Sequence, residues 1–379
     1  MKWRRVKLGE ILESSKECRF VEHPLDEKLI SVQLHGKGAV QRVLSQEKAP
    51  SPFKGFVGRE GQIVYSRIWA RKGAIAKIGK DLDGVVVSSE FPLFNVCPVA
   101  DIDYLIYAFQ SSSFKQQLEL AGAGTSGQNR IKEKAFLNFE IPLPPLGEQK
   151  RIAEILGGVA NVIHTVEQQI ETANQLEKSL FNQFRRQYSA LCSPIKNICK
   201  VQTGATPSRK NSAYYDGGIP WVKTGEVNGG KIEETEEYIT ELAVQETNCR
   251  KFPIGTILVA MYGQGATRGK VGILNCAAAT NQACAALIAL ACEDQEYIFA
   301  VLRNCYDELR NLGRGGTQPN LNLTLVKEFE IPWPEEFARE EFSQKWRELD
   351  NLRHLLHRKL SLLQELQKSL ANRAFAGLL

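Results

Sequence analysis

The chain has 379 residues, of which 43% are hydrophobic and 24% are charged, a composition typical of a globular protein with room for two domains. The net charge of +5 is mild, so it permits a polyanionic partner without requiring one. The nine cysteines are scattered without a CxxC pair, which argues against a disulfide scaffold and a zinc site and favours reduced thiols.

Neither targeting nor membrane insertion is indicated by the apolar segments. The start, MKWRRVKLGEILESS, lacks the apolar stretch of a secretory signal, so we expect a cytoplasmic location. The most apolar window, 275–292, carries Thr280, Asn281 and Gln282 at its middle. It is too short and too polar for a membrane span, and a buried strand after a turn fits it better.

In chain order, the first part predicts a mixed α/β unit. Strands are expected at 29–34, 62–66, 73–78, 84–89 and 91–96. A helix is expected over 103–122, and the alternating FLNFEI at 136–141 predicts a further strand.

A long helix is then predicted over 146–187, since Pro144 and Pro145 suit a helix start and no proline follows. Apolar residues recur along it at steps of three and four, the spacing of a coiled coil. The predicted seam consists of Ile152, Leu156, Val159, Ile163, Val166, Ile170, Ala173, Leu176, Leu180 and Phe184.

The second part repeats this order. Strands are expected at 219–223, 256–261, 270–274 and 283–290, followed by a helix over 296–313. A second long helix follows Glu335 and Glu336, acids that suit a helix N-terminus. Its predicted seam consists of Phe342, Trp346, Leu349, Leu352, Leu356, Leu360, Leu363, Leu366 and Leu370.

The string FEIP occurs twice, 190 residues apart, at 139–142 and 329–332. The same offset aligns Gln128 with Gln318 and LEKSL (176–180) with LQKSL (366–370). Gly61 and Gly73 pair with Gly255 and Gly269 after a shift of register, and the loops around them differ. This pattern indicates an internal duplication.

Each helix of about 40 residues reaches about 60 Å, longer than a compact domain needs. We therefore expect the two helices to cover each other as an antiparallel coiled coil, giving two tandem globular domains with an approximate two-fold relation. The alternative is that each helix lies along its own domain.

The chain resembles the DNA-specificity subunits of type I restriction–modification systems over essentially its whole length. The resemblance is carried by GATPSRKNSAYYDGGIPWVKTGEV (204–227), SSEFPLF (88–94), TNQAC (280–284), PLPPLGEQKRIAEIL (142–156) and the repeated Gln128 and Gln318. The second long helix departs from the pattern, because PEEFAREEF stands where PPLGEQKRI is expected.

The resemblance implies two target-recognition domains, at 1–144 and 189–334, and two spacer helices, at 145–188 and 335–379. Each domain would read one half of a bipartite site on double-stranded DNA. The helices would set the gap and dock two methyltransferase (modification) subunits, and restriction/translocase subunits would complete the nuclease. S-adenosylmethionine, ATP and magnesium would then belong to the partner subunits, with no cofactor or metal in this chain.

The residues agree with a chain that has no catalytic role. The sequence has no GxxxxGK[ST] phosphate loop and no Asn/Asp-Pro-Pro-Tyr string of amino-methyltransferases. His354 and His357 lack a third metal ligand nearby, and Asp81, Asp83 and Glu90 fit a turn better than a nuclease site.

DNA affinity comes largely from Lys and Arg on phosphates, while Arg, Lys, Asn and Gln read base edges. Polar and basic residues on loops between predicted strands are therefore the candidate DNA contacts. In the first domain these are Arg67, Trp69, Arg71, Lys72, Gln128, Arg130 and Lys132. In the second they are Thr206, Ser208, Arg209, Lys210, Lys223, Thr224, Tyr262, Gln264, Thr267, Arg268, Lys270 and Gln318.

For any one of these residues the alternative is a solvated surface charge, and the TPS string at 206–208 also fits a turn with a helix cap. Gln128 and Gln318 hold equivalent places, so they fit a brace better than a base contact. Because the other loops differ, we expect an asymmetric target. Four residues inserted in both helices would widen its gap by about 6 Å, or roughly two base pairs.

Three other functions remain open from the sequence. The chain fits the specificity part of a related system in which one partner both methylates and cleaves. It also fits a coiled-coil adaptor that never binds DNA, which salt-dependent binding to duplex DNA would exclude. An enzyme in its own right is the third, and the missing motifs argue against it.

Overall fold

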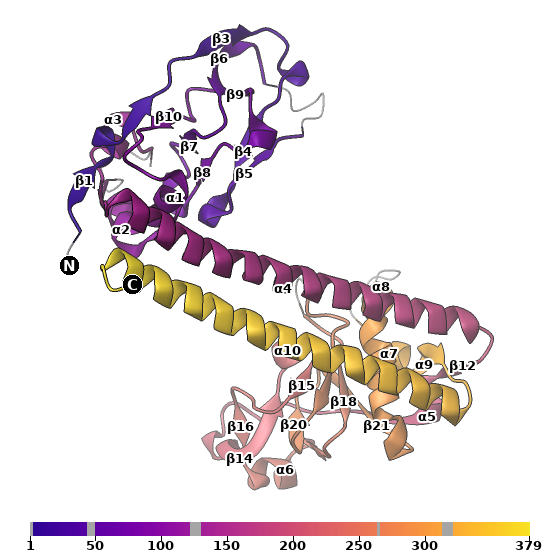
Figure 1. The fold of residues 1–379 in the computed structure, drawn as a ribbon. Helices are drawn as coiled ribbons and strands as arrows, with labels where there is room; N and C mark the ends of the chain where they lie inside the picture. The colour runs from indigo at the N-terminus through magenta and orange to yellow at the C-terminus, as the bar shows by residue number, and fades with distance from the viewer. Residues whose placement is uncertain (1–2, 44–49, 122–129, 264–265, 313–320) are drawn as a thin grey trace. The chain divides into compact units, whose positions relative to one another are not determined.

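The computed structural model describes residues 3–43, 50–121, 130–263, 266–312 and 321–379. Its contacts divide the chain into two units, Met1–Glu167 with Arg358–Leu379, and Gln168–His357. Two long helices, α4 (Leu146–Gln187) and α10 (Glu336–Phe375), each contribute residues to both units (Figure 1). Both bounds of α4 agree with the predicted span of 146–187.

The first unit is built on short antiparallel strands. A four-stranded sheet has the order β2-β10-β7-β8, a three-stranded sheet the order β3-β6-β9, and two pairs, β1-β11 and β4-β5, complete it. The strands are β1 (Arg5–Lys7), β2 (Leu12–Ser14), β3 (Cys18–Val21), β4 (Ile30–Val32), β5 (Ala39–Gln41), β6 (Phe53–Gly58), β7 (Ile63–Tyr65), β8 (Ile75–Lys77), β9 (Val85–Val87), β10 (Leu93–Val96) and β11 (Glu140–Pro142).

The main core of this unit lies between the four-stranded sheet, its helices and the helix pair. The helices are α1 (Ile102–Gln110), α2 (Ser112–Ala121) and α3 (Glu133–Leu137). Tyr65 and Phe136 stack inside this core with ring centroids 4.2 Å apart. Ile152 and Leu156 of α4 are fully buried in the same core as Ala374 of α10, so the first turns of α4 pack with the last turns of α10.

The second unit repeats the plan, with longer strands at the centre of its largest sheet. Its largest sheet has the order β13-β21-β18-β19-β15, a second has the order β16-β14-β20-β17, and β12 pairs with β22. The strands are β12 (Cys192–Pro194), β13 (Cys199–Thr203), β14 (Tyr215–Val222), β15 (Lys231–Ile232), β16 (Tyr238–Ile239), β17 (Lys251–Phe252), β18 (Ile257–Ala260), β19 (Val271–Leu274), β20 (Ala278–Thr280), β21 (Cys284–Ala289) and β22 (Glu330–Pro332). The helices are α5 (Ile195–Ile198), α6 (Glu241–Glu246), α7 (Gln295–Asn304), α8 (Tyr306–Asn311) and α9 (Leu323–Glu328).

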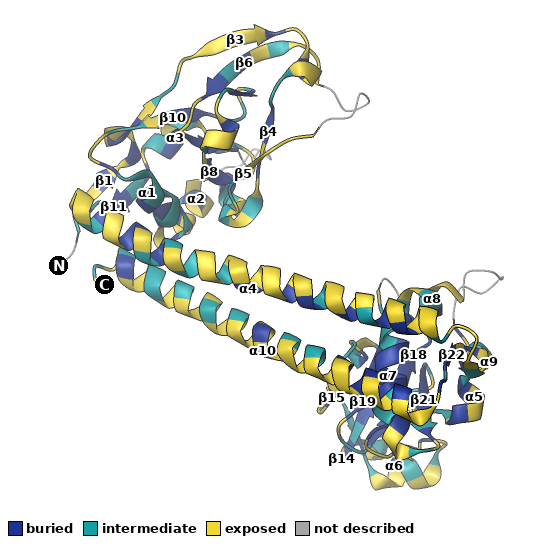
Figure 2. Ribbon diagram, turned by 45° about the vertical axis from the view of Figure 1, so that its right-hand side comes forward, coloured by how far each residue is buried: buried dark blue, intermediate teal, exposed yellow. Residues whose placement is uncertain are grey.

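Within this unit the helix pair is antiparallel. Phe184 of α4 lies against Phe342 of α10, with ring centroids 4.5 Å apart. Glu177 precedes Phe184 in α4, and its carboxylate lies 2.7 Å from the guanidinium of Arg353, which follows Phe342 in α10. Residue numbers thus fall along one helix as they rise along the other. Figure 2 shows buried residues recurring at intervals along both helices among exposed ones.

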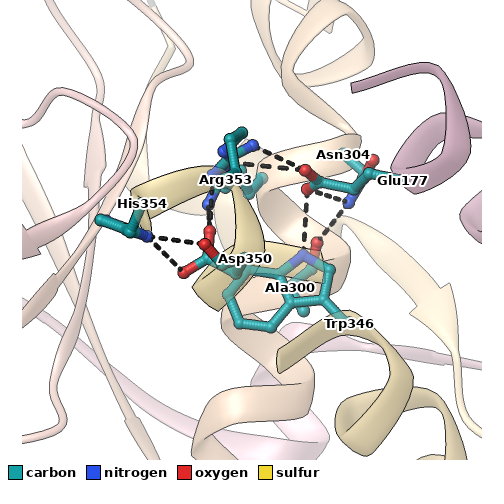
Figure 3. Close-up of polar contacts among 8 residues, drawn as sticks. Glu177, Ala300, Asn304, Trp346, Asp350, Arg353 and His354 are labelled. Atoms are coloured by element: carbon teal, nitrogen blue, oxygen red, sulfur yellow. Dashed lines mark hydrogen bonds and ion pairs between the residues drawn. The ribbon is translucent and has the colours of Figure 1, made fainter. Parts of the chain in front are cut away.

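A nearly buried polar cluster joins α4, α7 and α10 in the second unit (Figure 3). The Glu177 carboxylate accepts hydrogen bonds from the Trp346 indole at 3.0 Å and from the Arg353 guanidinium at 2.7 Å. Arg303 and Arg353 both contact Asp350, at 2.8 and 2.5 Å. Two cations and two anions therefore compensate one another in a region of low exposure.

The duplication seen in the sequence is present in the contacts. The Tyr104 hydroxyl donates to the Pro142 carbonyl at 2.7 Å, and the Tyr297 hydroxyl to the Pro332 carbonyl at 2.5 Å. Burial raises the pKa of both phenols. Each tyrosine thus ties the helix after the central sheet to the copy of FEIP in its own half.

The shifted glycine pairs are also equivalent. Gly61 and Gly255 have φ of 81° and 83°, and Gly73 and Gly269 have φ of 76° and 85°. These values lie in the left-handed region that favours glycine. The members of each pair therefore occupy the same turns around β7–β8 and β18–β19.

Two predicted helices and one predicted strand differ in the structure. The helix expected over 103–122 is two helices, because Ser111 adopts an extended backbone and its hydroxyl donates to the Ala108 carbonyl. The helix expected over 296–313 likewise breaks at Cys305, between α7 and α8. The strand expected at 136–141 is the end of α3 followed by β11, since Phe136 and Phe139 are spaced by a helical turn.

The predicted helix seams are correct in most positions and wrong in three. Leu176 is 51% exposed, and its neighbour Glu177 lies inside instead, at 7%. Leu352 and Leu366 are likewise 45% and 46% exposed. A straight helix drifts by about 20° per heptad relative to a strict 3.5-residue repeat, so some positions of such a pattern rotate out of the seam.

Candidate nucleic-acid interface

In the first domain, four candidate residues lie on the loop between β7 and β8. Trp69 is 46% exposed, and the Lys72 ammonium lies 5.0 Å from its ring centroid. Arg71 and Lys72 line an open hollow of 410 Å³ together with His35 and Lys115. Gly73 closes the loop, and its carbonyl accepts from the Gly36 backbone at 2.9 Å. The β7–β8 loop therefore exposes an aromatic ring and two neighbouring cations, and a backbone hydrogen bond holds its end in place.

Arg67 and Arg130 are held by glutamates. Arg67 lies 3.6 Å from Glu133, and Arg130 lies 3.4 Å from Glu90. The backbone joins the same segments, since Arg67 N–H donates to the Glu90 carbonyl and Ile131 N–H to the Arg67 carbonyl. The structure thus brings 67, 90 and 130–133 together in one cluster. Lys132 is exposed and precedes α3 as its N-cap residue.

In the second domain, the loop between β13 and β14 carries Thr206, Ser208, Arg209 and Lys210. Ser208, Arg209 and Lys210 are exposed, and the Thr206 hydroxyl lies 2.5 Å from the Gln282 amide oxygen. Thr206 therefore binds a neighbouring loop here and does not cap a helix, whereas Asn211 accepts from Ala213 N–H at the turn that follows.

Two aromatic residues of β14 hold the β13–β14 loop in place through hydrogen bonds to its backbone. The Trp221 indole donates to the Ala205 carbonyl at 3.1 Å, and the Tyr215 hydroxyl donates to the Pro207 carbonyl at 2.6 Å. Gly204 lies so close to Thr280 that an added Cβ would stand 1.9 Å from the Thr280 carbonyl oxygen. The loop has little room to rearrange at its base.

Arg209 and Lys223 share a carboxylate. Glu237 lies 2.6 Å from Arg209 and 3.0 Å from Lys223, and Glu236 lies 2.9 Å from Lys223. The Arg209 guanidinium holds the pKa of Glu237 below its usual value, and Lys223 acts in the same direction. Thr224 follows Lys223 at the start of a short turn and is half-buried.

A third loop, between β18 and β19, corresponds to the β7–β8 loop of the first domain. Tyr262 is 41% exposed on it, as Trp69 is on its counterpart. Thr267 and Lys270 are half-buried and close a turn, with Lys270 N–H donating to the Thr267 carbonyl. The Arg268 Nε is buried without a hydrogen-bond partner among the described residues.

Three candidates, Gln128, Gln264 and Gln318, lie outside the described residues. Sequence reasoning also missed the glutamates that hold the candidate arginines, above all Glu237 and Glu133. Their only signal was proximity to charge runs such as EETEE at 233–237, which is equally typical of a solvated turn.

Nothing in the described part of the chain resembles a metal or thiol centre. No group of three or more His, Cys, Asp or Glu residues is arranged there to hold an ion. Burial raises the pKa of Cys199, Cys284 and Cys305 to about 12, so these thiols stay protonated at neutral pH. Among the helices of the described segments, none is both long and apolar enough to cross a membrane.

This fold defines a class of protein: two β-rich domains that repeat one plan, with two long helices packed together. The family described as the type I restriction modification DNA specificity domain matches residues 1–175 and 192–364. Because the match spans most of the sequence, the chain belongs to this family, in which the subunit is typically non-catalytic and catalysis lies in the partner subunits.

Two relatives come from Methanocaldococcus jannaschii. The chain is 24% identical over 299 residues to the type I restriction enzyme MjaVIII specificity subunit, covering 72% of this chain and 69% of that protein. It is 34% identical over 145 residues to the MjaIX specificity subunit, covering 37% of this chain and 33% of that protein.

Two solved structures share the fold. The S subunit of a type I restriction–modification system from M. genitalium has a TM-score of 0.65 at 16% identity, over 99% of this chain and 96% of that one. A chain from a structural study of type I R-M complex assembly and conformational transition has a TM-score of 0.56 at 16% identity, over 100% of this chain and 98% of the other.

Proposed function

We propose that this specificity subunit reads an asymmetric, interrupted DNA site, one half with each domain. Residues 1–144 and 189–334 are the two target-recognition domains. Family membership supports DNA recognition, and the repeated plan of the two halves supports two reading domains.

The observation that carries the proposal is the equivalence of the β7–β8 and β18–β19 loops. Each follows the same strand of its domain, ends near a positive-φ glycine and exposes one aromatic side chain, Trp69 or Tyr262. Each loop also carries cations, and in the first the Lys72 ammonium lies 5.0 Å from the Trp69 ring centroid. The sequences of the two loops differ. Equivalent loops of different chemistry are what two readers of unlike half-sites need.

The cations fall into two groups. Arg67, Arg130, Arg209 and Lys223 have carboxylate partners. For the others, the described residues provide no ion pair, and they are suited to phosphates, where Lys and Arg supply affinity without reading sequence. This second group comprises Arg71, Lys72, Lys132, Lys210, Arg268 and Lys270.

The helices, residues 145–188 and 335–379, set the unspecified gap and dock two modification subunits. α4 has 42 residues and α10 has 40, so each reaches about 60 Å, longer than one DNA turn of about 34 Å. Exposed leucines on α10, Leu355 at 64% and Leu362 at 58%, offer apolar contacts to partner helices.

S-adenosylmethionine, and the ATP and magnesium used by a restriction subunit, bind to the partners in this proposal. The chain contributes the choice of sequence and the assembly surface. Cleavage therefore requires restriction subunits in addition to the modification subunits.

The test is to co-express the full chain with its modification subunit and to map methylated bases by sequencing. We expect an asymmetric motif interrupted by a gap of fixed length, together with binding to duplex DNA that weakens as salt rises. A continuous or palindromic motif that depends on this chain contradicts the proposal, and salt-independent or absent DNA binding favours a protein adaptor.

A further inference from the structure

Arg209 in the second domain is positioned before any DNA is bound. Its guanidinium lies 4.6 Å from the ring centroid of Tyr215 and 5.4 Å from that of Trp221. Both rings in turn hold the loop that carries Arg209, through the Pro207 and Ala205 carbonyls. A cation over aromatic rings on a fixed loop has lost most of its rotamer freedom, so ordering it on binding costs little.

The same guanidinium is paired with Glu237. The closest approach is 2.6 Å, and the side chains are 57% and 28% exposed. The Arg209 side chain therefore remains accessible to a ligand, whereas Glu237 is more covered, since its Oε2, the atom that faces Arg209, is buried. This pair is unlike Lys210, the adjacent residue, which is exposed and has no ion-pair partner among the described residues.

The charge balance of the pair disfavours an ordinary phosphate contact. Glu237 and Glu236 neutralise Arg209 and Lys223, so a phosphate approaching this point meets little net positive charge. A fully charged carboxylate also repels phosphate directly. The pKa of Glu237 is lowered by Arg209, so the carboxylate remains ionised at neutral pH.

A base pair, in contrast, offers groups that match both members. Guanine presents two acceptors, O6 and N7, to the fork of an arginine in the major groove. Cytosine presents its N4 amino group, which a glutamate accepts. An adjacent arginine and glutamate thus complement the two edges of one G·C pair without leaving either charge unmatched.

We infer that Arg209 and Glu237 act as one recognition unit that contacts a G·C base pair in the half-site of the second domain. This inference rests on the proposed function, because it requires that the domain read DNA. Glu237 has two roles in this recognition unit. It orients Arg209, and it lowers the affinity for DNA whose bases offer no partners to compensate for the ion pair that is disturbed on binding.

The test compares three variants of the full chain in complex with the modification subunit, by mapping methylation and by competition binding with oligonucleotides substituted at each position. Arg209→Lys keeps the charge and removes the fork. Glu237→Gln keeps the shape and removes the negative charge. Lys210→Ala is the matched control for an unpaired cation on the same loop.

We expect Arg209→Lys and Glu237→Gln to lose discrimination by about 10- to 100-fold at one and the same G·C pair, in one half-site only. Glu237→Gln should also bind unrelated DNA more tightly. Lys210→Ala should weaken binding to all sequences alike and reduce the slope of log affinity against log salt by about one, with the motif intact. Equal unfolding midpoints of the variants will show that folding is retained.

The inference is overturned if both variants leave the motif unchanged, if they relax different positions, or if the relaxed position is an A·T pair. These outcomes still allow an interrupted wild-type motif. A wild-type motif without a gap instead removes the proposed function itself, so the two failures are distinguishable.

Discussion

The Trp346 indole donates a hydrogen bond to the Glu177 carboxylate at 3.0 Å, and both residues are more than nine-tenths buried. Glu177 is on α4 and Trp346 on α10, so one bond fixes the axial match of the two helices in the second unit. Asn304 of α7 donates to the same carboxylate at 3.3 Å, which ties the second domain to the pair.

Replacing Glu177 by Ala should destabilise the second unit by about 3 kcal/mol, because Arg303 and Arg353 would remain in a region of low exposure with one anion between them. The readout is the urea midpoint of the full chain, followed by hydrogen exchange in α7 and α10. Leu176→Ala, a change at the adjacent exposed position, is the control and should shift the midpoint little. Equal effects of the two changes would show that the cluster contributes nothing specific.

Gln149 and Arg339 occupy equivalent places near the starts of α4 and α10, but the two side chains differ in charge. Gln149 is fully buried and bonds Asp101 N–H and the Val99 and Pro144 carbonyls, at 2.8 to 3.0 Å. Arg339 donates to the Asp294 carboxylate at 2.8 Å and to the Pro334 carbonyl at 2.7 Å. One half uses a neutral amide where the other uses an ion pair.

Arg339→Met should therefore cost more than Gln149→Met. The first change leaves the Asp294 carboxylate buried without a cation, at about 3 kcal/mol or more. The second leaves neutral backbone groups unpaired, at about 1–3 kcal/mol. Denaturant titrations of both variants check the order, and the reverse order would refute the comparison.

Gly204→Ala should displace the loop that carries Arg209. The added methyl would stand 1.9 Å from the Thr280 carbonyl oxygen. Because this oxygen belongs to the backbone, it cannot move aside as a flexible side chain could. We expect at least a tenfold loss of affinity for the methylated motif. Gly225→Ala is the control, because a Cβ there meets no atom within 4 Å. Wild-type affinity in Gly204→Ala would show that the loop is not held as described.

Thiol reactivity should follow burial. Cys18, Cys192 and Cys292 are exposed and should react first with a thiol reagent at pH 8. Cys199, Cys284 and Cys305 should react only after unfolding, because their pKa of about 12 keeps them protonated and burial excludes the reagent. Mass spectrometry of timed reactions assigns the order, and early labelling of Cys284 would contradict the buried β21.

The sequence was sufficient for those features that depend on periodicity and repetition. The span of α4, the repeated FEIP strands and the glycine pairs Gly61/Gly255 and Gly73/Gly269 all follow from spacing along the chain. Each of these features depends on local sequence or occurs in both halves, so it can be predicted without knowing which residues pack against it.

Contacts between distant segments were not predictable in this way. Glu177 lies inside the helix pair only because Trp346, Arg353 and Asn304 converge on it from elsewhere in the chain. Glu237 is similar, since nothing in its own segment shows that it holds Arg209. The break at Ser111 depended on a single hydroxyl that bonds backbone on both sides of it.

Whether the two helices set the gap is tested by mapping the methylated motif of a variant lengthened in both helices. Four residues are inserted after Glu167 in α4 and four after His357 in α10. Each insertion adds about 6 Å of helix. We expect both half-sites to keep their bases while the gap between them grows by about two base pairs. An unchanged gap in an active variant, or altered bases in either half-site, would contradict it.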